Sequence, residues 1–484
     1  MNPLKKLASD AAWYGLSSII GRLINYFLVP FYTSGILFPK EYGVLTDLLA
    51  YVAFFNIIYT YGMETAYFRF AKNDESKTFN QILSSILLSS FALSALLVVF
   101  ATPIVNLLGY SGNEIYIIYL AWIMAIDAVV AIPFARLRQQ KNPKKFAATK
   151  IINICVNVGL NLFFLWFLRD YDNGRNFDNS FKIGYILLAN LMANALLVIL
   201  LWKEFEGFRL TYDKEYYKTI FAYAFPLIFM GLAGQFNGLA DRFFIKYYLP
   251  VGMYAHDNLY MLGIYGACAK FSIFMVLVVQ AYKYAAEPFF FSKAEDKNAP
   301  ELFAKAMHWF IILGFLIVIG VFANVDWIKI LILRSKDYHE GIIIVPFLLV
   351  ANLFLGIYYN LTVWFKLTDK TKYGTYFAFF GAIITIIGNL VLLPLLGMVG
   401  AAIAGLITYF LMMFVCYYYG QKYFPIPYDL KGALKYFLVS LVAIVGIFYI
   451  NFDNIWINIL SKNMFVVIYL GVFWLMERKN LPKT

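Results

Sequence analysis

The residues of this sequence that are best placed to do chemistry are charged side chains within long apolar stretches. They are Arg22, Asp47, Glu64, Asp127, Asp241, Arg242 and Lys270. A charge at the centre of a bilayer costs about 2.5–3.5 kcal/mol on insertion scales, so such residues usually face a helix-bundle interior or a water-filled cavity. The chemistry they indicate is the binding of a polar or charged solute.

Arg22 and Lys270 predict a basic site within a cavity. Arginine offers a planar fork of donors and lysine a compact point charge, and together they suit a phosphate or pyrophosphate group. The alternative is an interhelical ion pair with Asp47 or Asp127. Both arrangements can hold in a resting state.

The other charges leave more than one interpretation open. Adjacent residues on a helix point about 100° apart, so we expect Asp241 and Arg242 not to pair with each other. Their place near the outer end of a span favours a structural salt bridge or snorkelling to the interface. Asp127 lies mid-span and is either a cation-coupling site or a partner for a basic residue. Asp47, Asp127 and Asp241 are therefore candidates for ion coupling or charge pairing.

No catalytic, metal or cofactor motif accompanies these charges. Cys155, Cys268 and Cys416 lie far apart in apolar stretches, and the three histidines are scattered along the chain. The sequence has no Gly-rich phosphate loop followed by lysine and no Ser or Cys nucleophile beside a histidine. We therefore predict a protein that is not an enzyme, with no catalytic residues, no metal and no cofactor.

The elements that must position these charges are membrane-spanning helices. Of 484 residues, 62% are hydrophobic and 14% are charged, whereas soluble domains carry about 25% charged residues. The apolar runs lack the alternation of a membrane barrel, and each can cross a hydrocarbon core of roughly 30 Å as a helix. The predicted spans are 11–34, 43–66, 80–107, 114–134, 147–168, 182–202, 219–246, 253–279, 306–324, 341–364, 375–394, 398–420, 433–451 and 459–476.

The positive charge of the chain follows the predicted topology. Net charge is +12, and Lys and Arg are about three times as frequent in one alternate set of loops as in the other. Because cytoplasmic loops are enriched in Lys and Arg, this asymmetry predicts that both termini are cytoplasmic. The basic balance therefore needs no nucleic-acid partner to explain it.

The chain also looks internally duplicated. The stretch Lys144-Lys145-Phe146, followed by a span that reaches Asn161-Leu162, recurs as Thr371-Lys372-Tyr373, followed by a span that reaches Asn389-Leu390. The predicted architecture is all-α and integral to the membrane, with about 14 transmembrane helices in two six-helix bundles around a central cavity and a C-terminal helix pair. The predicted divisions are residues 1–202, 203–420 and 421–484.

Blocks in matching order along the chain resemble a known family. They are Glu41–Gly43; Pro226 with Asp241–Arg242 and Gly252–Tyr254; Lys270 with Gln280–Tyr282 and Glu287–Phe289; Thr368–Tyr373; Gly388–Leu390; Leu392–Pro394; and Gly397–Ala404. Together they resemble bacterial polysaccharide-biosynthesis transporters, the oligosaccharide repeat-unit flippases of the multidrug/oligosaccharidyl-lipid/polysaccharide exporter superfamily. The resemblance covers nearly the whole chain.

The resemblance implies a substrate, a mechanism and a location. It implies alternating access and an undecaprenyl-pyrophosphate-linked oligosaccharide as the substrate, moved across the bacterial inner membrane for export of O-antigen, capsule or exopolysaccharide. Arg22 and Lys270, and then Arg242, are the positions to which a pyrophosphate-binding role carries over. Membrane lipid and polysaccharide polymerase machinery are the other expected partners.

Three other functions remain open at this stage. A cation-coupled multidrug exporter of the same superfamily would need carboxylates as the dominant cavity charges, whereas the mid-span set here mixes Arg and Lys with Asp. A peptidoglycan-precursor flippase shares the fold and the basic cavity. A membrane polymerase or ligase would carry a large outer loop, and the outer loops here, near 169–181 and 325–340, are short.

Overall fold

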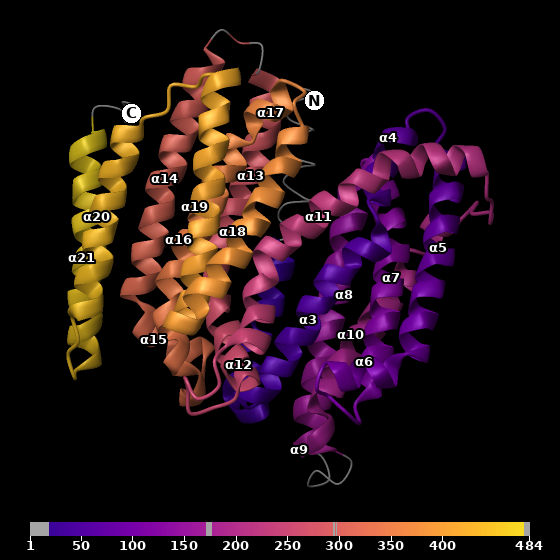
Figure 1. The fold of residues 1–484 in the computed structure, drawn as a ribbon, viewed down its shortest axis with the longest axis horizontal. Helices are drawn as coiled ribbons and strands as arrows, with labels where there is room; N and C mark the ends of the chain where they lie inside the picture. The colour runs from indigo at the N-terminus through magenta and orange to yellow at the C-terminus, as the bar shows by residue number, and fades with distance from the viewer. Residues whose placement is uncertain (1–18, 171–176, 294–295, 297, 479–484) are drawn as a thin grey trace. The chain divides into compact units, whose positions relative to one another are not determined.

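The computed structural model describes residues 19–170, 177–293, 296 and 298–478, which form helices and short connections (Figure 1). Thirteen helices in this part of the chain are long and apolar enough to cross a membrane. The predicted all-α membrane architecture is thus confirmed, and the count is close to the expected fourteen. The first predicted span, 11–34, begins outside the described residues, which are helical over 19–26.

The long helices alternate with short helical pieces. The first half contains α2 (Leu28–Phe31), η1 (Tyr32–Ile36), α3 (Pro39–Thr60), α4 (Met63–Phe70), α5 (Glu75–Val99), α6 (Ala101–Leu107), α7 (Glu114–Gln139), α8 (Pro143–Leu162), η2 (Phe163–Phe167), α9 (Leu168–Asp170), η4 (Asn179–Phe181), α10 (Lys182–Leu200), η5 (Trp202–Phe205) and α11 (Lys214–Tyr248). The second half contains α12 (Asn258–Cys268), η6 (Ala269–Ser272), α13 (Ile273–Lys293), α14 (Ala299–Ala323), α15 (Val325–Ile332), η7 (Lys336–Ile344), α16 (Val345–Leu361), α17 (Val363–Leu367), α18 (Lys372–Leu396), α19 (Met398–Tyr423), α20 (Leu430–Tyr449) and α21 (Ile455–Glu477).

Contacts divide the described residues into two compact units. Unit 1 consists of residues 19–28 and Val44–Phe236, and unit 2 consists of Val29–Gly43 and the residues from Asn237 onward. The boundaries between the units fall within α2, α3 and α11. The sequence-based division at residues 202 and 420 stays a prediction.

Unit 1 is organised around α7, which packs against α4, α5, α6, α8 and α10. Polar side chains join its helices inside the apolar packing. Tyr59 Oη and Ser94 Oγ lie 3.0 Å apart, and Ser94 donates to the Ala121 carbonyl at 2.9 Å. These bonds satisfy buried hydroxyl groups that would otherwise be costly in a non-aqueous environment.

The first turn of α3 belongs to unit 2, because its backbone lies very close to the backbone of α12. A Cβ on Gly43 would collide with the Leu259 carbonyl oxygen, and a Cβ on Gly263 would collide with the Pro39 carbonyl oxygen. Only glycine permits helix backbones to come this near, as in other small-residue contacts of membrane helices. A Lys40–Asp257 ion pair of 2.6 Å lies in the same region.

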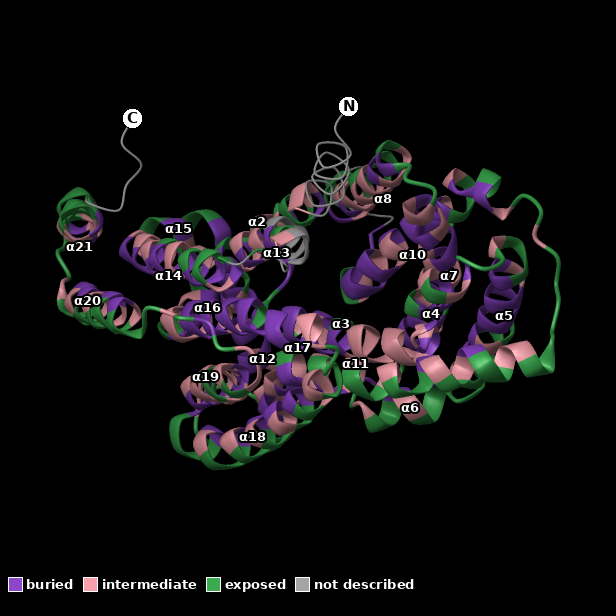
Figure 2. Cartoon of the chain, turned by 90° about the horizontal axis from the view of Figure 1, so that it is seen from above, coloured by how far each residue is buried: buried purple, intermediate pink, exposed green. Residues whose placement is uncertain are grey.

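The C-terminal helices α20 and α21 lie beside α14 in unit 2 (Figure 1). At one end of the pair, the Asp326 carboxylate accepts hydrogen bonds from Lys329 at 2.8 Å and Lys462 at 2.5 Å. Partial burial opposes ionisation of Asp326, but the two lysines outweigh this effect and hold the pKa of its carboxyl group below its usual range. Figure 2 shows long exposed faces on α20 and α21, and many of the exposed side chains are apolar, as expected of helices that face lipid.

Candidate functional site in unit 2

Lys270 lies at a break in a membrane-spanning helix. The α12 helix ends at Cys268, a 3₁₀ turn covers Ala269–Ser272, and α13 continues from Ile273. A stretch of 3₁₀ geometry within a long helix often marks a functional hinge. The Lys270 side chain is exposed although its neighbours Phe271 and Ser272 are buried. Among the described residues, the Lys270 ammonium has no hydrogen-bond or ion-pair partner.

Arg242 is held on α11 by its own helix. Its Nη1 donates to the Gly238 carbonyl at 3.0 Å and lies 3.4 Å from Asp241 Oδ1. The expectation that Asp241 and Arg242 do not pair was therefore wrong. The long arginine side chain folds back toward the preceding turn, which brings its guanidinium to the adjacent carboxylate despite the angle between the two Cβ atoms.

Tyr265 fixes the carboxylate beside Arg242. This fully buried tyrosine of α12 donates to Asp241 Oδ2 at 2.6 Å. Asp241 Oδ1 also accepts the backbone N–H of Arg242 at 2.9 Å. With both oxygens engaged, Asp241 is a structural anchor for the guanidinium group.

Unit 2 brings two of the three predicted basic residues together. The positive charges of Lys270 and Arg242 are close enough to repel each other. Asp241 offsets part of the arginine charge, whereas no ion pair within the described chain offsets Lys270. Two adjacent cations with one carboxylate form a site of net positive charge, which suits an anion with several oxygen acceptors.

The remaining predicted residues lie in unit 1. Arg22 is exposed on the helix of residues 19–26, and its part in an anion site stays a prediction. Asp47 is fully buried and accepts a hydrogen bond from Tyr110 Oη at 2.7 Å. Asp127 accepts a hydrogen bond from Asn194 Nδ2 at 2.9 Å and is attracted by the Lys150 ammonium.

Asp127 also lines a partly open cavity of about 460 Å³ inside unit 1. The walls come from α3, α4, α7 and α8. The lining residues are Asn56, Ile57, Thr60, Glu64, Asp127, Val130, Ala131, Phe134, Arg138, Phe146 and Lys150. Glu64 and Arg138 form an ion pair there.

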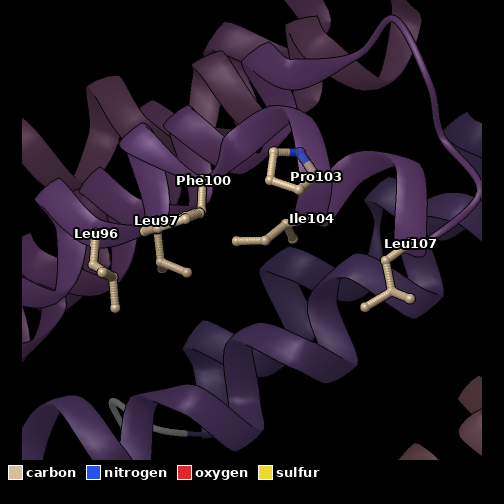
Figure 3. A pocket seen from close by; sticks show the side chains of 6 residues that line it. All are labelled: Leu96, Leu97, Phe100, Pro103, Ile104 and Leu107. Carbon is tan, nitrogen blue, oxygen red and sulfur yellow. The ribbon is translucent and has the colours of Figure 1, made fainter.

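A second hollow of unit 1 is entirely apolar. Figure 3 shows side chains of α5, α6 and the residue between them around a groove of about 370 Å³. The lining residues are Leu96, Leu97, Phe100, Pro103, Ile104 and Leu107. Its open apolar surface suits contact with lipid chains, and it offers no polar group to orient a solute.

Sequence reasoning missed several polar residues of these sites. Lys150 is not among the charges singled out above, although the predicted span 147–168 contains it; α8 begins at Pro143 and carries Lys150 into the cavity of unit 1. Tyr265 resembles any other aromatic residue in an apolar span, and only the fold places it against Asp241. The position of Lys150 two turns after a Pro at a helix start was the one signal available in the sequence.

The helices and the cation pair define the class of protein, a polytopic membrane protein with a transporter fold. A lipid II flippase structure, MurJ in an inward closed conformation, is similar with a TM-score of 0.73 at 16% identity, covering 95% of this chain and 98% of that one. An inward-facing multidrug resistance MATE family transporter of the MOP superfamily is similar with a TM-score of 0.65 at 12% identity, covering 86% of this chain and 97% of that one.

The sequence comparisons define the family. The model of the polysaccharide biosynthesis protein family matches residues 7–293, more than half of the chain, and the protein belongs to this family. Two uncharacterized membrane proteins of Methanocaldococcus jannaschii are also similar, each at 22% identity. MJ1068 matches over 98% of this chain and 95% of its own length, and MJ1375 over 83% and 95%.

Proposed function

We propose that this protein is a flippase that moves undecaprenyl-pyrophosphate-linked oligosaccharide repeat units across the bacterial inner membrane by alternating access. The family membership and the transporter fold support this proposal. The site in unit 2 supports an anionic headgroup. The single observation that carries most weight is the Lys270 ammonium, exposed in a helix break beside Arg242 and unpaired within the described chain.

The roles of the residues follow from their chemistry. Lys270 attracts the pyrophosphate as a point charge, and Arg242 donates from the guanidinium nitrogens that Gly238 and Asp241 leave available. Arg22 is a further candidate for this binding. The polyprenyl tail stays in lipid, and closure of the bundles exposes the sugar on the other side. Asp47, Asp127 and Asp241 remain candidates for ion coupling or charge pairing. In this proposal both termini are cytoplasmic. A polysaccharide polymerase acts on the exported repeat unit.

The test is complementation of a deletion strain. Lys270→Ala should insert at the wild-type level but leave lipid-linked repeat units facing the cytoplasm, because the headgroup loses its unpaired cation. Lys270→Arg should restore part of the export. Lys305→Ala removes the same charge from an exposed position of α14 and should export normally. Wild-type export by both Lys270→Ala and Arg22→Ala would overturn the site assignment.

A peptidoglycan-precursor flippase is the second candidate, favoured by the likeness to the lipid II flippase structure. Both candidates move a diphosphate-linked lipid, so the cation site does not separate them. Viability of the deletion strain does: loss of a sole peptidoglycan-precursor flippase is lethal, whereas loss of a surface-polysaccharide flippase leaves cells alive. A multidrug exporter is disfavoured because the exposed, unpaired charge of the unit 2 site is cationic.

A further inference from the structure

The cavity of unit 1 contains charged groups that do not neutralise one another by contact. Lys150 points its ammonium at the Phe134 ring, 4.3 Å from the centroid, and has no ion-pair partner among the described residues. It is attracted by Asp127 and repelled by Arg138 without contacting either. The cavity is therefore lined by a hydrogen-bond donor, Lys150, and an acceptor, Asp127.

Unused acceptors line the same cavity. Asn56 lies near Asp127, and its buried Oδ1 has no hydrogen-bond partner in the described structure. An unpaired buried carbonyl costs about 1–3 kcal/mol unless water or a ligand supplies a donor. Asp127 itself accepts a hydrogen bond from Asn194, which in turn receives one from Asn153 Nδ2 at 3.4 Å. Asn56, Asp127 and Lys150 are thus polar residues of the cavity lining that are available to a bridging group.

Acidic and basic side chains balance in this cavity, so neither a simple anion nor a simple cation is the ligand that fits it best. Glu64 and Asp127 are matched by Arg138 and Lys150, so an anion meets two carboxylates and a cation meets two basic groups. A hydroxyl group can accept from Lys150 and donate to Asn56 Oδ1 or Asp127 at once. The walls between these polar groups are apolar, formed by Ile57, Val130 and other residues.

We propose that this cavity is a saccharide-binding subsite that takes one or two neutral sugar rings. The sugar hydroxyls bridge Lys150 to Asn56 and Asp127, while the C–H faces of the ring pack on the apolar wall. The volume of about 460 Å³ lies in the range of roughly 300–1,000 Å³ that is usual for small-molecule sites. The inference rests on the proposed function, since it assigns the sugar part of the proposed substrate to unit 1.

The cavity also has a defined depth. Arg138 and Asp127 are eleven positions apart on α7, which corresponds to about 16 Å along the helix. Arg138 marks the end that predicted topology assigns to the cytoplasm, where the loops are rich in Lys and Arg. A sugar entering from that side would pass the Glu64–Arg138 ion pair before it reached Asp127.

The experiment measures binding of free sugars to the full-length protein in nanodiscs by saturation-transfer NMR. The probes are glucose, galactose, mannose, N-acetylglucosamine and N-acetylgalactosamine, with inorganic pyrophosphate titrated separately. At least one sugar should bind saturably. Asp127→Asn and Lys150→Met should each weaken that binding about tenfold, as expected for loss of a charge-assisted hydrogen bond. Ala131→Phe should abolish it by filling the cavity.

Two controls distinguish loss of the sugar site from loss of the fold and from failure of the proposed function. Leu107→Phe enlarges an apolar side chain of the groove in Figure 3 and should leave sugar binding unchanged. Lys270→Met should weaken pyrophosphate binding without affecting the sugar. If pyrophosphate does not bind but the sugar still depends on Asp127, the proposed function fails and the subsite stands.

Three results would overturn the subsite. One is the absence of saturable binding by every sugar in the set. Another is sugar binding that persists at full strength in both Ala131→Phe and Asp127→Asn, each of which must show a wild-type unfolding temperature. The third is stronger binding of phosphoethanolamine than of any sugar, with the same dependence on Asp127 and Lys150, which would assign the cavity to a zwitterion.

Discussion

The two units differ in the balance of acidic and basic side chains at their candidate sites. Unit 1 places two acidic and two basic side chains around one cavity, where Glu64 and Arg138 pair directly. Unit 2 leaves the Lys270 ammonium unpaired among the described residues and puts Arg242 beside it, with Asp241 as the only carboxylate bonded to either. Lys150 of unit 1 also lacks an ion-pair partner among the described residues, but Asp127 attracts it, whereas the charge acting on Lys270 is the second cation, Arg242. This difference in charge balance is consistent with the proposal that unit 2 receives an anion.

The largest expected effect comes from removing both cations of unit 2. Lys270→Met combined with Arg242→Met should weaken pyrophosphate binding at least about 100-fold, since two charge-assisted hydrogen bonds contribute about 1.5–3 kcal/mol each. The matched control is Lys77→Met with Lys145→Met, which removes two cations that are already paired in unit 1. Equal losses in the two double variants, measured by calorimetric titration, would remove the distinction between the units.

The second largest expected effect is that of ionic strength, which should change the affinities of the two sites differently. Raising ionic strength from about 0.1 to 1 M shortens the Debye length from about 10 to 3 Å. Pyrophosphate binding in unit 2 should weaken about tenfold across this range, because Lys270 is exposed and salt screens its attraction for the anion. Neutral sugar binding in unit 1 should change little. Parallel titrations at both salt concentrations test this, and a salt-independent affinity for pyrophosphate contradicts it.

Asp241→Asn should have a smaller effect, and in the direction of tighter binding. The substitution removes the charge that offsets Arg242, while the Gly238 carbonyl still holds the guanidinium at 3.0 Å. Loss of a like charge several ångströms from the anion is worth about 1 kcal/mol at a high effective dielectric, or about fivefold in affinity. Weaker binding in this variant would show that Asp241 acts mainly by positioning Arg242.

The smallest expected effect concerns a paired carboxylate of unit 2. Asp326, bonded to Lys329 and Lys462, has a depressed pKa in the folded protein. Its contribution to stability is therefore present above the unfolded-state value of about 3.9 and is lost as pH falls through the lower folded value. We expect Asp326→Asn to destabilise the wild type by about 1 kcal/mol at pH 6.

The pH dependence of unfolding checks this prediction. The difference between wild type and Asp326→Asn should begin to shrink as pH falls below about 4, where the carboxyl group of the unfolded chain takes up a proton, and should vanish once the pH is below the lower folded pKa. Unfolding temperatures of the two proteins in the same detergent at pH 6 and pH 3 give the comparison. A difference that stays constant over this range would mean that the carboxylate charge contributes nothing.

The sequence was enough to predict the helical membrane architecture, because continuous apolar runs of this length have few other uses. It also identified Lys270 and Arg242, because charges in such runs stand out. It could not pair Asp241 with Arg242, since that bond depends on the side-chain conformation and on Tyr265 from another helix. Lys150 was missed because a lysine near the start of a span looks like a loop charge in the sequence, and only the fold places it in the cavity.

The central claim is that unit 2 recognises the diphosphate of a lipid carrier through Lys270 and Arg242. Its most direct test compares binding of undecaprenyl pyrophosphate and neutral undecaprenol to the full-length protein by native mass spectrometry. We predict a preference of at least about tenfold for the pyrophosphate lipid, as expected for a charge-assisted contact, and its loss in Lys270→Met with Arg242→Met. Equal binding of both lipids by the wild type, or a preference that survives in the double variant, would contradict the account.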